Sequence, residues 1–226
     1  MSRVLALVEG QTEQAFVKQI LAPDLARQNV FLTACLIGRP GGRGGVRSWA
    51  RVRSEFLAAL KQDRQRCCTT MFDFYGLPAD WPGAGEARKK PFGEAAELIE
   101  RAVHVDICEA LGGSFNPDRF IPYIQMHEFE ALLFSDTRVL AEVVGEPSLQ
   151  RHFDEVVAEC GEPEAIDDGA STAPSKRIIA KADGYQKVSR GMIAAKRIGL
   201  ARMKETCPHF AAWVRRLEAL SEREPV

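Results

Sequence analysis

The sequence predicts an α/β fold, in which a parallel sheet is flanked by helices and followed by a helical C-terminal extension. Short apolar runs alternate with segments of helical periodicity in the first half, and the segments after Met126 all have helical character. Strands separated by helices are typical of βαβ units with right-handed crossovers. We therefore expect one domain over residues 1–226, with an α/β core over 1–135 and helices over 136–226.

The strands are indicated by short continuous apolar runs, which are typical of buried parallel strands. These runs cover residues 4–8, 31–37, 67–72 and 120–124. The last run contains Pro122, which has no N–H to donate to a neighbouring strand. We therefore expect this strand to lie at an edge of the sheet, or its proline at the strand start.

The helices are indicated by apolar residues spaced three and four positions apart. In the first half they are expected over 12–28, 48–60 and 94–111, with Ser48 as an N-cap. Residues 77–92 contain three prolines and two glycines and are expected to form a long loop. After Met126, helices are expected over 127–135, 137–144, 148–159, 175–182, 189–204 and 207–220.

Composition and charge are those of an ordinary globular protein. Hydrophobic residues make up 46% and charged residues 27%, which excludes a disordered or fibrous chain. The formal net charge is −1, so binding to nucleic acid would require a local basic patch. The six cysteines contain no C-x-x-C pair, so we expect them to be buried apolar residues. No apolar run is long enough for a membrane span or a signal peptide, so we expect a cytoplasmic protein.

Acidic residues follow three of the predicted strands. Glu9 comes directly after the first strand, with Glu13 four residues later, and Asp73 follows the third strand. Glu128 and Glu130 follow the fourth. The carboxyl ends of parallel strands meet at one edge, where ligands collect, and carboxylate oxygens suit Mg²⁺ or Mn²⁺. We therefore expect Glu9 and Asp73 to hold a metal ion, with Glu13 and Glu128 assisting. Glu9 is alternatively a general base toward water.

Each of these acids also has a structural interpretation. Glu13 is alternatively a first-turn acid that stabilises a helix start. Asp73 is alternatively a residue that caps the next turn, and His127 is either a general base or a histidine at a helix start. Glu128 and Glu130 are two positions apart and cannot share a helical face, so at most one of them is expected to bind the metal.

Basic residues gather in two places that suit phosphate groups. The glycine-rich segment 38–47 carries Arg39, Arg43 and Arg47 but lacks the Walker A pattern. The segment 172–177 has helix-start signals at Pro174 and Ser175, followed by Lys176 and Arg177. The alternative for residues 172–177 is an exposed basic turn without a ligand.

Charge is segregated in the C-terminal half of the chain. Residues 154–168 contain seven acidic residues and no basic one, whereas residues 176–204 contain nine basic residues against Asp183 alone. These segments are either two solvated faces that pair with each other, or a phosphate-binding strip partly covered by an acidic loop.

Acids at three strand ends surrounded by basic segments indicate metal-dependent chemistry on a phosphodiester. No serine lies in a G-x-S-x-G elbow, and no G-x-G-x-x-G follows a strand. Triad hydrolases and dinucleotide-binding enzymes are therefore disfavoured.

Four motifs in order resemble a bacterial family known as domain of unknown function 4276 (DUF4276). They cover residues 8–13, 73–78, 127–136 and 172–177, and the resemblance continues through 198–200 and 207–210. This family is similar to the Toprim superfamily of topoisomerases, primases and overcoming-lysogenization-defect (OLD) nucleases. The resemblance implies a Toprim-like, Rossmann-like fold and a partner ATPase of the ABC/AAA type, in arrangements associated with phage defence.

Carried over to this sequence, the Toprim glutamate matches Glu9 and the second acid of OLD-like nucleases matches Glu13. The Toprim Asp-x-Asp would begin at Asp73, but its second acid is replaced by Tyr75. This departure leaves open whether catalysis would use one metal ion or two. Glu128 or Glu130 could supply the carboxylate that is missing at Tyr75. The resemblance also matches Lys176 to a late lysine that stabilises transition-state charge.

We therefore expect a Mg²⁺- or Mn²⁺-dependent nuclease that acts on DNA or RNA with an ATPase partner. One alternative is a degenerate scaffold that binds the ATPase or nucleic acid without cutting, which Tyr75 favours. Another is a small nucleotide phosphohydrolase whose loop over residues 77–92 closes on its substrate. The sequence leaves open the substrate, the partner and whether the chain forms a homo-oligomer.

Overall fold

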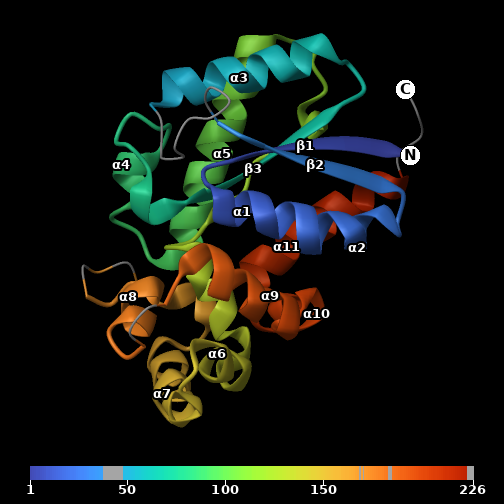
Figure 1. Ribbon diagram of the computed structural model, residues 1–226. Helices are drawn as coiled ribbons and strands as arrows, with labels where there is room; N and C mark the ends of the chain where they lie inside the picture. Colours follow the sequence, from blue (N-terminus) through green and yellow to red (C-terminus); the bar gives the residue numbers. More distant parts are fainter. Residues whose placement is uncertain (38–47, 168, 170, 183–184, 223–226) are drawn as a thin grey trace. The chain divides into compact units, whose positions relative to one another are not determined.

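The structure is a computed structural model that describes residues 1–37, 48–167, 169, 171–182 and 185–222 (Figure 1). Arg39, Arg43 and Arg47, which we expect to contact phosphate, lie outside the described residues. The chain divides into two compact units. The first comprises Met1–Phe72, Gly76–Ile124 and Arg215–Val226, and the second comprises Asp73–Tyr75 and Gln125–Val214.

The first unit is built on a five-stranded sheet, which confirms the predicted α/β class with its parallel sheet. Its strands are β1 (Ser2–Val8), β2 (Val30–Leu36), β3 (Cys67–Asp73), β4 (Phe120–Ile121) and β5 (Ile124–Gln125). The order is β2-β1-β3-β4, and β5 also pairs with β3. β1 runs parallel to β2 and β3, with Val8 opposite Leu36 and Met71, and β4 runs parallel to β3. The arrangement is Rossmann-like.

Pro122 divides the fourth predicted strand into two short ones, β4 and β5. Because proline has no N–H, the hydrogen bonding between β3 and this strand is interrupted at Pro122. The Thr70 side chain instead bonds the backbone of the following residue, Tyr123. The Thr70 hydroxyl donates to the Tyr123 carbonyl over 2.5 Å and accepts from the Tyr123 N–H over 2.6 Å. This explains how β3 buries a threonine at 0% exposure. β4 stands at the end of the strand order, as Pro122 predicted.

Helices cover both faces of the sheet in the first unit. Figure 1 shows α1 (Gln11–Phe16) and α2 (Ala22–Ala26) on one face, and α3 (Trp49–Gln62) and α5 (Phe92–Leu111) on the other. A π-helical segment, Val17–Leu21, joins α1 to α2, where the missing N–H of Pro23 disturbs the regular bonding. Ser48 precedes α3 as predicted, but its side chain makes no capping bond. The Asp80 carboxylate instead accepts from the Trp49 N–H over 2.9 Å.

The predicted loop over 77–92 is packed against the first unit and contains the short helix α4 (Ala84–Ala87). Trp81 is 2% exposed, and its ring lies 5.0 Å, centroid to centroid, from those of Trp49 and Phe72. The chain returns to this unit at its end, where the Ser2 hydroxyl donates to the Leu220 carbonyl over 2.6 Å.

The second unit is helical, as the sequence predicts for residues after Met126. Its helices are α6 (Thr137–Val144), α7 (Gln150–Cys160), α8 (Pro174–Ile179), α9 (Met192–Ile198), α10 (Leu200–Thr206) and the first part of α11 (Pro208–Glu218). The predicted helix over 189–204 is interrupted at Gly199, whose φ of 81° ends α9. A 3-10 helix, Phe129–Asp136, buries every side chain from Phe129 to Ser135 and so forms the core of this unit. Within the described residues, no helix is long and apolar enough to cross a membrane.

Candidate functional site

The first group of predicted residues lies at the carboxyl end of β1. The Glu9 N–H donates to the Met71 carbonyl of β3 over 3.3 Å. Gly10 is the N-cap of α1, and Glu13 is the third residue of that helix and 6% exposed. A Cβ on Gly10 would lie 2.7 Å from Glu13 Oε2, so the carboxylate folds back over the glycine. An acid in the first turn also stabilises the helix start through the helix dipole.

Asp73 is the last residue of β3 and belongs to the second unit by its contacts. Its Oδ1 accepts from the Phe129 N–H over 3.0 Å, at the start of the buried 3-10 helix. Tyr75, which stands where the resemblance implies an acid, is 47% exposed. The Tyr75 N–H donates to the carbonyl of His127, whose φ is 62°. The contact of Asp73 is therefore with a distant segment and not with the next turn of the chain.

Glu128 is fully engaged by hydrogen bonds within the second unit. Its Oε2 accepts from the Ser175 N–H over 2.9 Å, and its Oε1 accepts from the Ser175 hydroxyl and from Lys187 Nζ, both over 3.0 Å. Burial raises the pKa of Glu128, but these bonds and the Lys187 charge outweigh burial, so the pKa lies below its ordinary value. Glu128 is therefore a stable carboxylate.

Glu130 lies on the other side of the same lysine. Its Oε2 accepts from Lys187 Nζ over 3.2 Å, whereas its buried Oε1 has no hydrogen-bond partner among the described residues. Glu130 is 1% exposed, and burial raises its pKa to about 7. The nearby Tyr185 hydroxyl is also buried without a partner in the described chain, and its pKa is raised by burial and by the two carboxylates.

Lys187 is the cation of this cluster. Burial lowers the pKa of its ammonium, but Glu130, Glu128 and Asp73 together raise it above the ordinary value. The side chain is 41% exposed, so the ammonium holds two buried carboxylates while one side remains open to solvent. We define Asp73, Glu128, Glu130 and Lys187 as the carboxylate–lysine cluster.

The first turn of α8, which we expected to bind phosphate, holds the Glu128 carboxylate. Ser175 lies inside the helix rather than at its cap, since the N-cap is Ala173. Lys176 is exposed. Arg177 Nε donates to the Thr172 carbonyl over 2.8 Å, and its Nη1 lies 4.0 Å from Glu159. The structure therefore brings Ser175, and not Lys176 or Arg177, into contact with a predicted acid.

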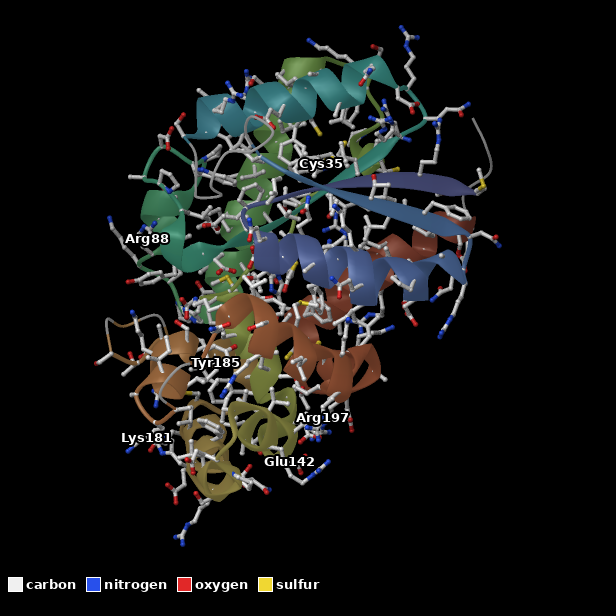
Figure 2. The ribbon with its side chains drawn as sticks, in the orientation of Figure 1. Cys35, Arg88, Glu142, Lys181, Tyr185 and Arg197 are labelled. Atoms are coloured by element: carbon white, nitrogen blue, oxygen red, sulfur yellow. The ribbon has the colours of Figure 1, made fainter. Side chains whose placement is uncertain are left out.

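Other cations of the basic segment 176–204 also bind groups of the protein. Arg197 of α9 pairs with Glu142 of α6 (Figure 2). Arg190 donates to the Val144 carbonyl over 2.6 Å, and Arg202 donates to the Ser135 carbonyl over 2.9 Å. The partners of these three arginines lie outside the acidic segment 154–168. Arg177 does reach the acidic segment, through its pair with Glu159.

The acidic residues differ in how well they suit a divalent cation. Among the described residues, no group of three or more His, Cys, Asp or Glu side chains could hold a metal ion. Glu128 does not fit as a ligand in this arrangement, because Lys187 fills the cation position beside it. Glu9 follows β1 and Asp73 ends the paired strand β3, and both side chains offer the carboxylate oxygens by which Mg²⁺ or Mn²⁺ is commonly bound.

Residues 8–218 match a family model described as "Domain of unknown function (DUF4276)". The chain belongs to this family. No significant match to a curated protein or to a solved structure was found. The DUF4276 match includes every motif on which the resemblance was based, and the family description carries no activity, substrate or cofactor.

Two features of the carboxylate–lysine cluster leave no signal in the DUF4276 sequence. Lys187 was only one of nine basic residues in its segment, and nothing local distinguishes it. The spacing of Glu128 and Glu130 was judged for an α-helix, but Glu128 has an extended backbone before the 3-10 helix, with φ −144° and ψ 157°. The carboxylates of Glu128 and Glu130 can therefore both reach the Lys187 ammonium. If both residues lay in the same α-helix, their side chains would point to different faces.

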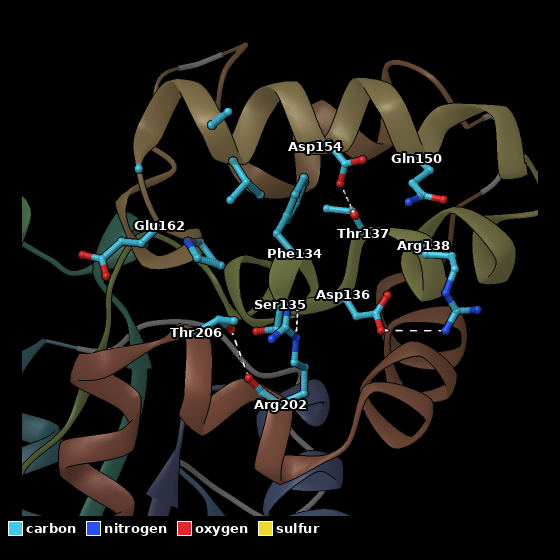
Figure 3. Close-up of a pocket in the computed structure, with 14 residues that line it drawn as sticks. Phe134, Ser135, Asp136, Thr137, Arg138, Gln150, Asp154, Glu162, Arg202 and Thr206 are labelled. Atoms are coloured by element: carbon cyan, nitrogen blue, oxygen red, sulfur yellow. Dashed lines mark hydrogen bonds and ion pairs between the residues drawn. The ribbon is translucent and has the colours of Figure 1, made fainter.

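A pocket of about 490 Å³ in the second unit contains none of the predicted site residues (Figure 3). Two acids in its lining have hydrogen-bond partners within this unit. Asp136 caps α6 by accepting from the Val139 N–H over 2.9 Å, and Asp154 accepts from the Thr137 hydroxyl. Asp136 and Asp154 of this DUF4276 pocket therefore stabilise the start of α6 and its contact with α7.

Glu130→Gln is expected to change how the stability of the DUF4276 chain depends on pH. The folded-state pKa of Glu130 is raised to about 7 from 4.5, so its charged form is disfavoured by folding. The wild type therefore loses stability as pH rises from 4.5 to 7, and the glutamine variant lacks this loss. Urea unfolding at pH 5 and pH 8 should show the wild type losing about 2 kcal/mol relative to the variant.

The control for this measurement is Glu109→Gln, which removes an exposed carboxylate from α5. This variant should follow the wild type at both pH values. Parallel pH dependence of the wild type and Glu130→Gln would show that Glu130 titrates as an ordinary glutamate.

Proposed function

We propose that the chain hydrolyses phosphodiester bonds of DNA or RNA, using one Mg²⁺ or Mn²⁺ ion held by Glu9 and Asp73. The observation that supports this most is the pairing of β1 with β3. Val8 lies opposite Met71 in parallel register, Glu9 directly follows β1, and Asp73 ends β3. Ligands of open α/β sheets bind outside the carboxyl ends of neighbouring strands, and this is where both carboxylates are attached.

The residues have separate tasks in this proposal. Glu9 and Asp73 bind the cation through carboxylate oxygens, and Glu9 is also the candidate base toward water. The Phe129 N–H restrains the Asp73 carboxylate by its hydrogen bond, which limits the orientations that the ligand can adopt. A bound divalent ion would supply charge neutralisation at the phosphate and a more acidic water.

Lys187 is a better candidate than Lys176 for the lysine that stabilises developing negative charge. Asp73 is among the carboxylates that raise the pKa of Lys187, whereas Lys176 lies exposed on α8. The pair of buried glutamates fixes the ammonium in place before any substrate arrives, which is the condition for electrostatic stabilisation of a transition state. Glu128 and Glu130 therefore act through Lys187 in this proposal and not as metal ligands.

The resemblance to Toprim proteins and OLD nucleases is the further support for nuclease chemistry. It also carries the proposal that an ATPase of the ABC/AAA type is the partner and that the pair acts in phage defence. The resemblance lies in the motifs at residues 8–13, 73–78, 127–136 and 172–177.

A second candidate function is a scaffold that binds its partner or nucleic acid without cutting. Two observations favour it. Tyr75 replaces the acid that a second metal would require, and Lys187 neutralises the acids near Asp73 in place of a metal. Such a protein would need no divalent cation.

The deciding experiment incubates the purified chain with plasmid DNA, single-stranded DNA, RNA and free nucleotides in Mn²⁺, Mg²⁺ or EDTA. The proposal expects metal-dependent cleavage of a polymer that Glu9→Gln and Asp73→Asn each reduce more than about 100-fold. Both substitutions preserve side-chain size, and asparagine at 73 keeps an oxygen for the Phe129 N–H. Glu109→Gln, on the exposed face of α5, is the matched control and should retain full activity.

The other outcomes separate the alternatives. Cleavage that survives both substitutions means that the site lies elsewhere or that the activity is a contaminant. Activity on nucleotides but not on polymers favours the nucleotide phosphohydrolase. If no substrate is cleaved and Mn²⁺ leaves the melting temperature unchanged, the metal site is rejected and the scaffold is favoured.

A further inference from the structure

We infer that a basic pocket in the first unit binds a nucleotide, recognised as an aromatic base joined to a phosphate. The pocket has a volume of about 460 Å³, within the usual range for small-ligand sites. Its walls come from the C-terminal end of α3, the turn before β3, and the segment between α5 and β4. It therefore lies at the amino ends of β3 and β4, at the opposite strand ends from Glu9 and Asp73.

Three cationic side chains line the basic pocket, and no carboxylate does. They are Lys61, Arg64 and Arg119. Lys61 and Arg64 are exposed, and neither makes an ion pair or side-chain hydrogen bond within the described part of the chain. Two other pockets of the protein differ in this respect. One has Asp136, Asp154 and Glu162 in its lining, and the other has Glu97 and Glu100. The uncompensated positive charge indicates an anionic occupant.

Arg119 is held rigidly at the edge of the basic pocket. Its Nε donates to the Arg66 carbonyl over 3.0 Å, and its Nη2 donates to the carbonyls of Leu60 and Asp63 over 3.0 and 2.6 Å. These bonds satisfy carbonyls at the end of α3, so the position of the guanidinium is fixed by the backbone. Nη1 has no hydrogen bond to any described residue and remains available to a phosphate oxygen.

An apolar and aromatic wall accompanies the cations. The Arg119 guanidinium carbon lies 5.2 Å from the centre of the Phe115 ring, and Leu60 and Leu111 also line the basic pocket. Asn116 uses its Oδ1 to accept from the Asp118 N–H over 3.0 Å, which leaves its amide N–H groups as donors for a base edge. Phosphate alone would not require this wall, whereas a base can pack on an aromatic ring next to bound phosphate.

The ligand chemistry has two sources, a free nucleotide or one nucleotide of a single strand. Binding requires neither a divalent cation nor Glu9 and Asp73. The inference therefore does not depend on the proposed hydrolysis, and all binding is measured in EDTA so that the two can fail separately.

The test uses the full chain and three probes, namely AMP, inorganic phosphate and a fluorescein-labelled single-stranded DNA of ten nucleotides. Calorimetry measures the first two, and fluorescence anisotropy measures the third. The test variants are Lys61→Ala combined with Arg64→Ala, and Phe115→Ala. The matched control combines Lys18→Ala with Arg27→Ala, which removes the same charge from exposed positions on the other face of the sheet.

We expect the wild type to bind AMP more tightly than inorganic phosphate. The Lys61/Arg64 double variant should raise the Kd for AMP at least about tenfold, and the control pair should leave it unchanged. Phe115→Ala should raise the Kd for AMP about fivefold or more without affecting phosphate. If the DNA strand also occupies the pocket, the double variant should reduce the slope of log K against log salt by about 1.4.

Several results would overturn the inference. One is equal binding of AMP by the double variant and the control pair, since the basic pocket would then not be the site. Another is inorganic phosphate that binds as tightly as AMP, since no base would then be recognised. Binding of AMP with no binding of DNA assigns the site to free nucleotides, and displacement of DNA by AMP assigns it to strands as well.

Discussion

Lys187→Met is expected to lower the free energy of unfolding by about 2–4 kcal/mol at pH 8. The lysine is the shared hydrogen-bond donor of Glu128, 8% exposed, and Glu130, 1% exposed. Removing one partner of a buried ion pair costs about 3–5 kcal/mol, because the remaining charge stays buried without compensation. We lower that range because the Lys187 side chain is itself 41% exposed.

The loss should be smaller at pH 6 than at pH 8. The pKa of Glu130 is about 7 in the wild type, and removal of the ammonium raises it further. At pH 6 the carboxyl is therefore mostly protonated and needs no cation. The Ser175 N–H and hydroxyl still donate to Glu128 in the variant at both pH values.

The matched control is Lys176→Met on the neighbouring helix α8. Lys176 is exposed, so this variant should change the free energy of unfolding by no more than about 0.5 kcal/mol. Urea unfolding of both variants at the two pH values measures the difference. An equal effect of the two substitutions would contradict the carboxylate–lysine cluster.

Glu164→Ala is expected to lower the free energy of unfolding by about 3 kcal/mol. Glu164 is 0% exposed, and its two oxygens accept from the N–H groups of His209 and Phe210 over 2.9 and 3.0 Å. These residues follow Pro208 at the start of α11, so the carboxylate serves as the N-terminal cap of that helix. Alanine would leave two N–H groups of the first turn without an acceptor, at about 1–3 kcal/mol each when buried.

Two further variants make the Glu164 measurement specific. Glu162→Ala removes an acid two residues away and should change the free energy of unfolding by no more than about 0.5 kcal/mol. Glu164→Gln keeps one acceptor oxygen and should recover part of the loss. Thermal unfolding that places Glu164→Ala level with Glu162→Ala would show that the carboxylate does not support α11.

The strands could be predicted from the sequence because a buried parallel strand is apolar on both faces. Residues 4–8 and 67–72 have this character, and they fall within β1 and β3. The Glu9 and Asp73 positions at the strand ends followed directly from those bounds. The division of the fourth predicted strand into β4 and β5 at Pro122 was not predicted. It is stabilised by the hydrogen bond from the Thr70 hydroxyl to the Tyr123 carbonyl, and these residues are 53 positions apart.

The expected end of the α/β part also differs from the observed end of the sheet unit, because long-range packing decides it. We expected the α/β part to extend to residue 135, whereas the sheet unit takes in residues up to Ile124 and regains the chain at Arg215. The segment 127–135 reads as a helix by its apolar content, but burial of every side chain from Phe129 to Ser135 makes it the centre of the second unit. Periodicity does not reveal which unit an entirely apolar segment joins.

The sequence by itself determined the α/β class, the parallel strands and the acids at their carboxyl ends, since these follow from local hydrophobicity and from residue order. Only the tertiary structure decided which charges meet. Glu128 meets Lys187 across 59 residues and Glu164 meets the start of α11 across 45 residues, and neither contact leaves a local pattern. Burial then makes each pairing obligatory, because a carboxylate removed from water must find a cation or hydrogen-bond donors wherever the fold brings them.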